Sequence, residues 1–204
     1  MTPQREAKFR RVVSNRQPGL SVLLEDVHDP HNISAVLRTC DSVGIMEIYV
    51  LYTSTDIERL KMGKRSSGSA RKWVDVHLFT DRTACFEAIR TKYDTILATH
   101  LSSDAIQLYE ADLSGSKVLV FGNEKEGVSE ASLALCDGNI RIPQYGMIES
   151  LNISVACAVT LYETLRQRQE KGKYSVSELS VDEQETLFHI YKERTKTGRT
   201  KEPR

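Results

Sequence analysis

The sequence predicts an α/β protein built around a parallel β-sheet. Short apolar segments such as 21–27 (SVLLEDV) and 117–122 (KVLVFG) are typical of strands buried on both faces. Stretches with apolar residues at helical spacing separate these segments. The chain has 204 residues, of which 40% are apolar, so it is long enough to bury the core of one such domain. We therefore expect a sheet flanked by helices, with ligand sites at the carboxyl ends of its strands.

The expected elements alternate along the chain. Thr2-Pro3 suits the start of a helix over 2–15, because proline is favoured at the first helical position, and the turn residues at 17–19 end it. The predicted strands are 21–27, 47–52, 74–79, 95–100, 117–122 and 139–142. The other predicted helices are 32–43, 81–93, 129–135, one that begins at Ser150, and 181–195. We expect a loop over 53–70 and a linker over 172–180.

The helix predicted to begin at Ser150 has a regular apolar pattern. Its apolar positions recur at the spacing of an amphipathic helix, and they are Leu151, Val155, Ala158, Tyr162 and Leu165. Ser150 and Asn152 are both good helix caps, so capping explains them without any function.

Charge is balanced over the whole chain but not along it. Lys plus Arg and Asp plus Glu both number 28, so net charge gives no general attraction to nucleic acid. Basic residues gather in the first 20 residues, at 61–72, at 166–173 and in the C-terminal tail. This distribution suits a protein with one basic face, although for any single stretch solvated helix surface is the favoured explanation.

Several classes of protein are disfavoured by the sequence. The four cysteines form no CxxC pair, and we interpret them as reduced residues of a cytoplasmic protein. His28 and His31 have no carboxylate at metal-ligand spacing, so we expect no metal site. The sequence has no long apolar run, so we expect neither a signal peptide nor a membrane span. The chain also lacks a GxGxxG after its first strand, a Walker loop and a GxSxG context.

Four loops that follow predicted strands carry unusual polar residues. They are HDPHN (28–32), THLSSD (99–104), FGNEKEG (121–127) and IPQYGMIESLN (142–152). The glycines of the third loop suit a tight turn close to a ligand, and its Glu124 is either a site carboxylate or a helix-cap partner. Arg38 lies off the apolar face of the 32–43 helix, where it is either a site residue or a solvated charge.

Three of these features resemble the motifs of a known enzyme family. Asn32 and Arg38 lie in HNISAVLRTCDSVG, Glu124 lies in GNEKEG, and Ser150 and Asn152 lie in the IP…GM…SLNIS run. In this order the motifs are similar to those of the SPOUT class of S-adenosylmethionine-dependent RNA methyltransferases, and within it to the SpoU/TrmH branch of ribose 2′-O-methyltransferases. The resemblance covers about 21–168, and the 28–44 segment with the basic helix before it is most similar to members that modify guanosine 18 of tRNA.

The resemblance implies a fold and an assembly. It implies an α/β domain over 21–170 whose C-terminal part forms a deep trefoil knot, preceded by a basic helix over 1–20 and followed by a linker, helix and basic tail over 171–204. It implies S-adenosylmethionine as methyl donor, held by backbone groups of three loops. The donor-binding positions would be Thr99, His100, Leu101, Gly122, Ile142, Pro143, Ser150 and Leu151. It also implies a homodimer in which one subunit offers Arg38 to the site of the other.

The resemblance also implies roles for single residues and a substrate. The catalytic positions would be Arg38, Asn32, Glu124, Ser150 and Asn152. The phosphate-binding positions on tRNA would be Arg5, Lys8, Arg10, Arg11, Arg16, Arg166 and Arg168. The sequence departs from relatives at Gln144-Tyr145, which could alter the pocket rim, and in its basic 61–72 stretch, which could alter RNA docking.

Other readings stay open at this stage. The sequence shows no additional N-terminal RNA-binding domain, so we expect tRNA; ribosomal RNA and the tRNA wobble position are the alternative substrates. A knotted RNA-binding protein without catalysis is a further alternative, and a nucleotide-binding oxidoreductase is disfavoured by the missing GxGxxG. A guanidinium remains protonated up to a pH of about 12, so Arg38 either stabilises a developing alkoxide or loses its proton only transiently.

Overall fold

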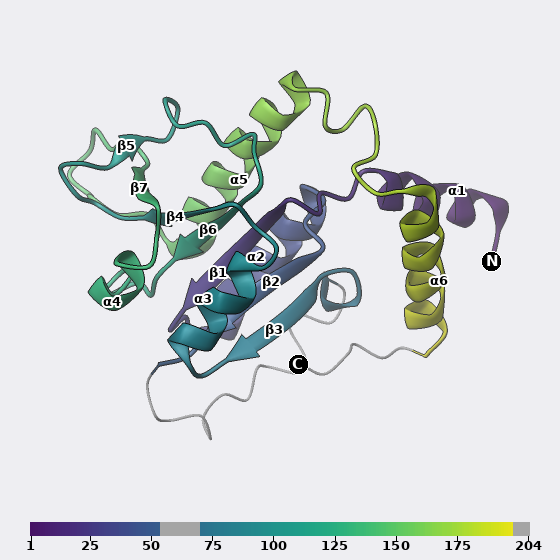
Figure 1. The fold of residues 1–204 in the computed structure, drawn as a ribbon, viewed down its shortest axis with the longest axis horizontal. Helices are drawn as coiled ribbons and strands as arrows, with labels where there is room; N and C mark the ends of the chain where they lie inside the picture. The colour runs from purple at the N-terminus through teal and green to yellow at the C-terminus, as the bar shows by residue number, and fades with distance from the viewer. Residues whose placement is uncertain (54–69, 198–204) are drawn as a thin grey trace.

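A computed structural model describes residues 1–53 and 70–197, and within them it contains one parallel sheet (Figure 1). The sheet has seven strands in the order β3-β2-β1-β6-β4-β7-β5, and every neighbouring pair is parallel. The strands are β1 (Leu20–Glu25), β2 (Glu47–Leu51), β3 (Asp75–Phe79), β4 (Thr95–Thr99), β5 (Ile106–Gln107), β6 (Lys117–Phe121) and β7 (Gly138–Arg141). The predicted parallel α/β architecture is confirmed.

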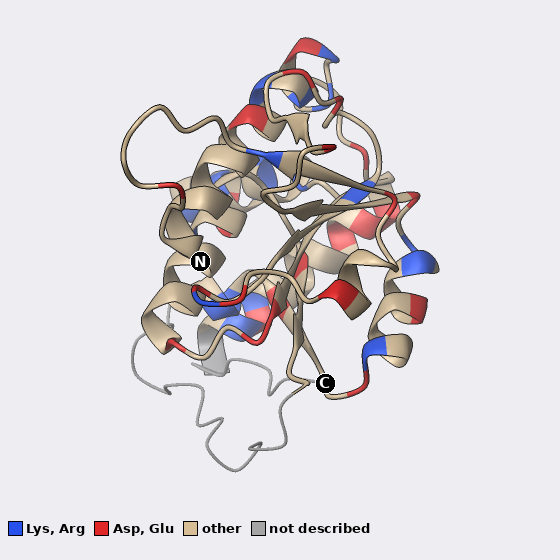
Figure 2. Ribbon diagram, turned by 90° about the vertical axis from the view of Figure 1, so that its left-hand side faces the viewer, with Lys and Arg blue, Asp and Glu red and all other residues tan. Residues whose placement is uncertain are grey.

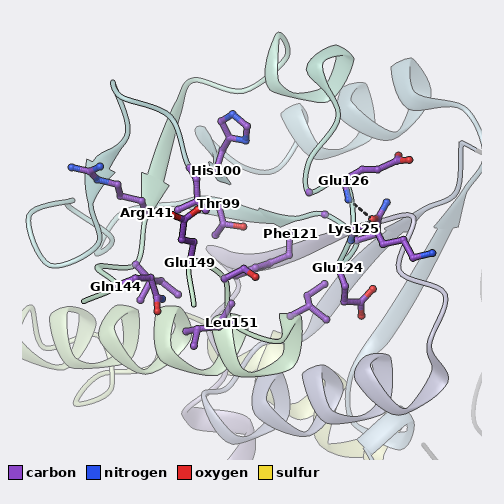
Figure 3. A pocket seen from close by; sticks show the side chains of 18 of the residues that line it. Thr99, His100, Phe121, Glu124, Lys125, Glu126, Arg141, Gln144, Glu149 and Leu151 are labelled. Carbon is purple, nitrogen blue, oxygen red and sulfur yellow. Dashed lines mark hydrogen bonds between the residues drawn. The ribbon is translucent and has the colours of Figure 1, made fainter. Parts of the chain in front are cut away.

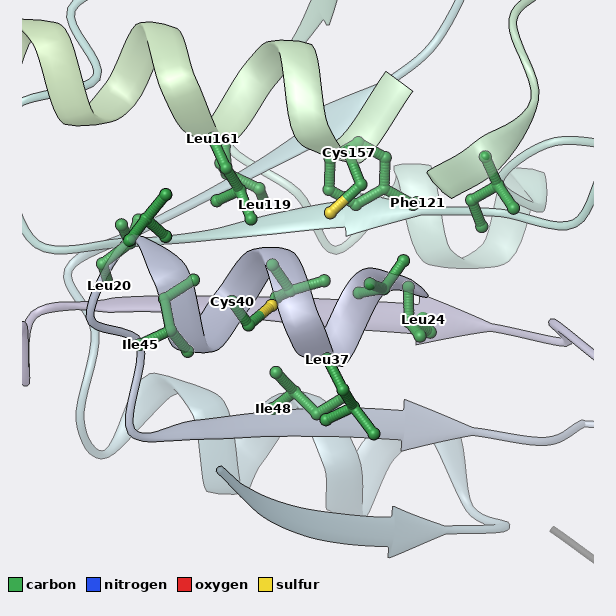
Figure 4. Packing of buried hydrophobic residues seen from close by; sticks show 14 of the residues in the cluster. Leu20, Leu24, Leu37, Cys40, Ile45, Ile48, Leu119, Phe121, Cys157 and Leu161 are labelled. Atoms are coloured by element: carbon green, nitrogen blue, oxygen red, sulfur yellow. The ribbon is translucent and has the colours of Figure 1, made fainter. Parts of the chain in front are cut away.

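Helices cover both faces of this sheet. The helices are α1 (Pro3–Ser14), α2 (Pro30–Ser42), α3 (Arg82–Arg90), α4 (Glu130–Leu133), α5 (Ile153–Glu170) and α6 (Val181–Thr197), with a 3-10 turn η2 (Ala70–Lys72). One apolar cluster joins α2 and α5 to the sheet, as Figure 4 shows for Leu37, Cys40 and Cys157. A second cluster, on the other face, contains Cys85 and Phe86 of α3. The interiors of β1, β2 and β6 are therefore buried on both faces, as their unbroken apolar runs predict.

Most predicted elements occur within a few residues of their expected bounds. The structure adds β5 and η2, which are too short to leave a periodic pattern in the sequence. The expected loop over 53–70 and most of the basic 61–72 stretch lie outside the described residues, as does the basic tail. The cysteines are free, as predicted, and Cys40, Cys85 and Cys157 are buried.

The start of α5 differs from the prediction. Asn152 caps the helix: its side-chain oxygen accepts a hydrogen bond from the Ser154 backbone N–H at 2.9 Å, so the helix begins at Ile153 and not at Ser150. A cap needs extended backbone just before the first helical residue, and Asn152 has that conformation with φ −52° and ψ 140°.

The predicted apolar face of α5 is only partly covered. Val155 is 46% exposed and Tyr162 is 53% exposed, whereas the buried face of the helix is rotated away from them. Its buried residues are Ile153, Cys157, Thr160, Leu161, Glu163, Thr164 and Arg168. The two threonines can lie inside because their hydroxyls donate to helix carbonyls four residues earlier, at 2.9 Å each. An apolar stripe consequently remains on the outside.

Two arginines predicted to contact RNA lie inside the protein. Arg168 is fully buried, and its guanidinium donates to Gly115 O at 2.9 Å and to the Glu178 carboxylate at 2.6 Å. Arg16 is also fully buried, bonds to the Asp41 carboxylate at 2.7 Å and lies against the Tyr191 ring. Both therefore join segments of the fold, and the prediction that they contact phosphates is wrong for this structure.

A partly buried carboxylate at the amino end of the sheet makes the stability of the fold depend on pH. Glu47 opens β2 and bonds to His77 Nε2 at 2.7 Å and to Lys92 Nζ at 2.8 Å. Burial acts to raise the pKa of Glu47, but the hydrogen bonds of His77 and Lys92 outweigh it and lower the pKa to about 2. A carboxylate with a lowered pKa stabilises the fold above its unfolded value of about 4.3, and this contribution is lost as the pH falls toward the folded value.

We predict that Glu47→Gln lowers the free energy of unfolding at pH 7 by about 1–3 kcal/mol, because the charged hydrogen bonds are lost. The wild type should lose stability between about pH 4.3 and pH 2, and the variant should lose less over the same interval. Urea unfolding followed by circular dichroism at several pH values measures both effects. Equal acid dependence of the two proteins would contradict the assignment.

Candidate functional site

The carboxyl ends of β4, β6 and β7 enclose a cavity of about 360 Å³ (Figure 3). This is the edge of a parallel sheet at which ligand sites are built. The lining comes from the loops after the three strands and from the start of α5. It comprises Thr99, His100, Leu101, Phe121, Gly122, Asn123, Glu124, Lys125, Glu126, Gly127, Ile140, Arg141, Ile142, Gln144, Glu149, Ser150, Leu151, Ile153 and Ala156.

The loop after β6 is a compact turn, which we call the β6 loop (residues 122–128). The Asn123 side-chain oxygen accepts from the backbone N–H groups of Lys125 and Glu126 at 2.9 and 2.8 Å. Asn123 O accepts from Gly127 N at 3.0 Å, and Gly127 has a φ of +70°. A Cβ atom at Gly122 would lie 1.9 Å from the Gly127 carbonyl, so no other residue fits without movement of the backbone. The glycines predicted to permit a tight turn do so.

Side chains of the three sequence motifs meet beside this cavity. Asn32 Nδ2 donates a hydrogen bond to the Glu124 carboxylate, and Asn32 Oδ1 accepts one from Asn152 Nδ2 at 3.2 Å. Asn32 lies in α2, and Asn152 directly precedes α5. These two helices pack against each other. We call this set of contacts the Asn32 bridge. It joins residues 32, 124 and 152, which are far apart in sequence.

The HDPHN segment has a structural role as well. Asp29 caps α2, because its side chain accepts from the His31 backbone N–H at 2.8 Å, and Pro30 is the first helical residue. The cap fixes where α2 begins and places Asn32 in its first turn, next to the β6 loop. His28 stacks on Tyr52, with ring centroids 5.5 Å apart.

Arg38 is the predicted catalytic position that neither lines the cavity nor takes part in the Asn32 bridge. Its side chain is exposed on α2, and it does not line the cavity. Within the described residues no hydrogen bond or ion pair of Arg38 is found, and Asn32 bonds to Glu124 and Asn152 instead of to Arg38.

Seven of the eight positions predicted to hold the donor line the cavity. Thr99, His100 and Leu101 follow β4, and Thr99 Oγ1 donates to Val120 O at 3.0 Å. Pro143 is the position that does not line it. Gln144, expected at the pocket rim, also lines the cavity. The sequence did not identify the other lining positions, which are Phe121, Asn123, Lys125, Glu126, Gly127, Ile140, Arg141, Glu149, Ile153 and Ala156. Most belong to the loops already singled out, so including each whole loop would have found them.

The cavity combines an apolar part with an acidic part. Leu101, Phe121 and Ile142 offer apolar surface, while Glu124, Glu126 and Glu149 bring carboxylates from two loops. Lys125 and Arg141 are the cationic groups of the lining. Such a cavity suits a ligand with a flat apolar portion and a positively charged portion. In the described part of the chain, no group of three or more potential ligands could hold a metal ion.

The predicted phosphate-binding residues differ in their surroundings. Arg5, Lys8, Arg10 and Arg11 are exposed on α1, where Arg10 forms ion pairs with Glu6 and Glu185. Arg166 is paired with Glu163 and Glu170 on α5. Figure 2 shows basic and acidic segments interspersed in its view of the molecule.

Among the described helices, none is long and apolar enough to cross a membrane.

Comparison with known proteins gives consistent matches. Residues 19–162 match the model of the SpoU rRNA Methylase family. A tRNA (guanosine(18)-2′-O)-methyltransferase of Thermus thermophilus is 43% identical over 85% of this chain and 88% of its own. The crystal structure of an A. aeolicus TrmH/SpoU tRNA modifying enzyme superposes with a TM-score of 0.84, at 34% identity, over 94% of this chain and 96% of that one.

A third match contains a bound ligand. The SpoU methyltransferase AviRb from Streptomyces viridochromogenes, in complex with the cofactor AdoMet, superposes with a TM-score of 0.67 at 26% identity. The match covers 76% of this chain and 62% of AviRb.

We predict that Gly122→Ala destabilises the protein by about 3 kcal/mol and distorts the cavity, because the new Cβ meets backbone atoms that cannot rotate away. Gly127→Ala is the matched control: its Cβ meets nothing within 4 Å, so only the cost of its positive φ, about 1 kcal/mol, is expected. Chemical unfolding of the three proteins measures the difference. A loss at Gly122 no larger than that at Gly127 would show that the turn is not tight.

Proposed function

The chain belongs to the SpoU rRNA Methylase family, and we propose that it transfers a methyl group to the ribose 2′-oxygen of guanosine 18 in tRNA. The observation that carries the proposal is the Asn32 bridge, which joins the three motifs of such enzymes beside a cavity at the sheet edge. Curated relatives from Thermus, Escherichia and Aquifex bear that name, at 36–43% identity over 85–95% of this chain.

The methyl donor is S-adenosylmethionine, and the cavity fits its chemistry. Its apolar wall of Leu101, Phe121 and Ile142 suits an adenine ring. The carboxylates of Glu124 and Glu149 suit the positive charges of a sulfonium and an ammonium group. A volume of about 360 Å³ lies within the range of small-molecule sites. We propose that the backbone at 99–101, 122 and 142–151 holds the donor, with Pro143 fixing the path of the last segment.

The donor supplies an electrophilic methyl group on a neutral leaving group, so the protein has to position and activate a weak nucleophile. We assign activation to Arg38, an exposed cation of the first motif for which no hydrogen bond or ion pair is found within the described residues. Its guanidinium remains protonated near neutral pH, so it stabilises the negative charge that develops on the 2′-oxygen. Transient loss of its proton, aided by an RNA phosphate, is the competing role.

The other motif residues hold the geometry. Asn32 keeps the Glu124 carboxylate in place and orients Asn152, which caps α5. Ser150 lines the cavity just before this cap, where its hydroxyl can contact donor or ribose. Glu124 thereby faces the cavity from the β6 loop in a fixed orientation.

A homodimer completes the proposal. Arg38 lies outside its own cavity, and an apolar surface is exposed around the start of α5. This α5 surface comprises Tyr145, Met147, Ile148, Leu151, Val155 and Tyr162, with Met147 fully exposed. Exposed apolar area of this kind marks an interaction site, and a second copy of the chain would supply Arg38 in trans.

The trefoil knot also belongs to the proposal. A crystal structure traced through 122–170 would test it.

The tRNA would lie along the basic helix α1. Arg5, Lys8 and Arg11 are exposed there and form no ion pair within the described residues, so they can contact phosphates. Arg16 and Arg168 are excluded from this role by their burial. The domain bounds 1–20, 21–170 and 171–204 remain part of the proposal, as does action in the cytoplasm, where tRNA is modified.

We predict that the protein labels tRNA transcripts with the methyl group of labelled S-adenosylmethionine, and that alkaline cleavage is blocked at position 18 alone. Arg38→Ala should lose turnover by about 100-fold or more while binding the donor normally. Arg38→Lys should not restore turnover, because the planar fork is lost.

Each other outcome changes the account in a definite way. A block at the anticodon, or label only in ribosomal RNA, would replace the substrate. Donor binding without label in any RNA would indicate a binding protein. An equal loss of donor affinity in Arg38→Ala would contradict the role of that residue.

For the dimer, we predict that Val155→Glu converts the protein to a monomer in sedimentation experiments, because a charge enters the α5 surface. Val176→Glu is the matched control, since Val176 is 76% exposed in the linker away from this surface. A wild-type monomer, or an intact dimer in Val155→Glu, would overturn the proposed interface.

A further inference from the structure

A buried carboxylate lies at the carboxyl end of β1, the strand that pairs with β6. Glu25 is the last residue of β1 and is only 1% exposed. Its carboxylate accepts hydrogen bonds from Ser129 N at 2.9 Å, from Ser129 Oγ at 2.8 Å and from Ser132 Oγ at 2.5 Å. Arg82 of α3 donates a further bond at 3.3 Å. None of these four residues lines the cavity or belongs to the predicted site.

These bonds hold the far end of the β6 loop. Ser129 directly follows residues 122–128 and caps the short helix α4. The bonds of Asn123 close the loop on itself, so its internal shape is held and its position depends on its anchors. Glu124 is anchored by Asn32, and Ser129 is anchored by Glu25. Both anchors come from one short segment, residues 25–32, so this segment sets the position of the loop over the cavity.

A carboxylate is an unusual choice for this place. Burying a charge costs free energy unless it is paired, and a neutral side chain could fill the same volume. The ionised form is an acceptor only, so it turns both serine hydroxyls and the Ser129 N–H toward itself. Arg82 compensates the charge and also donates to Ser129 Oγ and Ser132 Oγ at 3.2 and 2.9 Å. The result is a loop end with one allowed orientation.

We propose that Glu25 is a positioning residue for S-adenosylmethionine, acting through Ser129 to hold the β6 loop in the donor-binding position. The inference rests on the proposed function for the identity of the ligand. Without the carboxylate the β6 loop should be less ordered in the free protein. Donor binding should then be weaker, because part of the binding free energy is used to order the loop. The rate of methyl transfer at saturating donor should change little, because neither Glu25 nor its hydrogen-bond partners line the cavity.

The test compares two glutamates at opposite ends of the sheet. Glu25→Gln should raise the dissociation constant for S-adenosylmethionine, measured by titration calorimetry, by about tenfold, and should change kcat by less than about threefold. Glu47→Gln is the control: it removes a partly buried, hydrogen-bonded carboxylate from the amino end of β2, and it should leave the dissociation constant unchanged. Ser129→Ala removes one of the bonds and should give a rise of about threefold.

An unchanged dissociation constant in both Glu25→Gln and Ser129→Ala would overturn the proposal. An equal rise in Glu47→Gln would overturn it too, because the effect would then follow general destabilisation. If Glu25→Gln does not fold, Ser129→Ala decides alone. A wild type that binds the donor but methylates no RNA would contradict the proposed function, and the comparison of dissociation constants would still decide the role of Glu25.

Discussion

The site depends on the two hydrogen bonds of one side-chain amide. Asn32 donates to Glu124 with its nitrogen and accepts from Asn152 with its oxygen, so it needs a group that is donor and acceptor at once. Aspartate would repel the Glu124 carboxylate, and an apolar residue would leave both partners unpaired. The cap residues Asp29 and Asn152 fix the helix starts that make this meeting possible. The first turn of α2, the β6 loop and the start of α5 thus share one geometry.

The sequence was sufficient to predict the parallel sheet and the loops that form the cavity. Runs such as 117–122 are apolar throughout because both faces of β6 are covered, and this is visible without a structure. Because parallel strands end at one edge, the polar loops after them had to gather there. Asn32, Glu124 and Asn152, which link the loops, were also predicted to be site residues. The resemblance to an enzyme family identified them, and their spacing in the sequence did not.

The failures have a common physical origin. Helical spacing identified an apolar stripe on α5, but it does not tell whether that stripe packs on the sheet or lies on the surface. Val155 and Tyr162 of this stripe are exposed. Arg16 and Arg168 were interpreted as surface charges, yet both are buried, because backbone carbonyls and the carboxylates of Asp41 and Glu178 surround them. The role of Glu25 was invisible for the same reason: its partners Ser129 and Ser132 follow it by more than 100 residues. Such partners are set by tertiary packing.

A double-mutant cycle on Asn32 and Glu124 tests most directly whether the Asn32 bridge organises the cavity. The dissociation constant for S-adenosylmethionine would be measured for the wild type, Asn32→Ala, Glu124→Ala and the double variant. If the bond between them positions the β6 loop, the double variant binds about as weakly as the weaker single variant, a coupling of about 1 kcal/mol or more. Fully additive losses would show that the two residues act separately and would contradict the account.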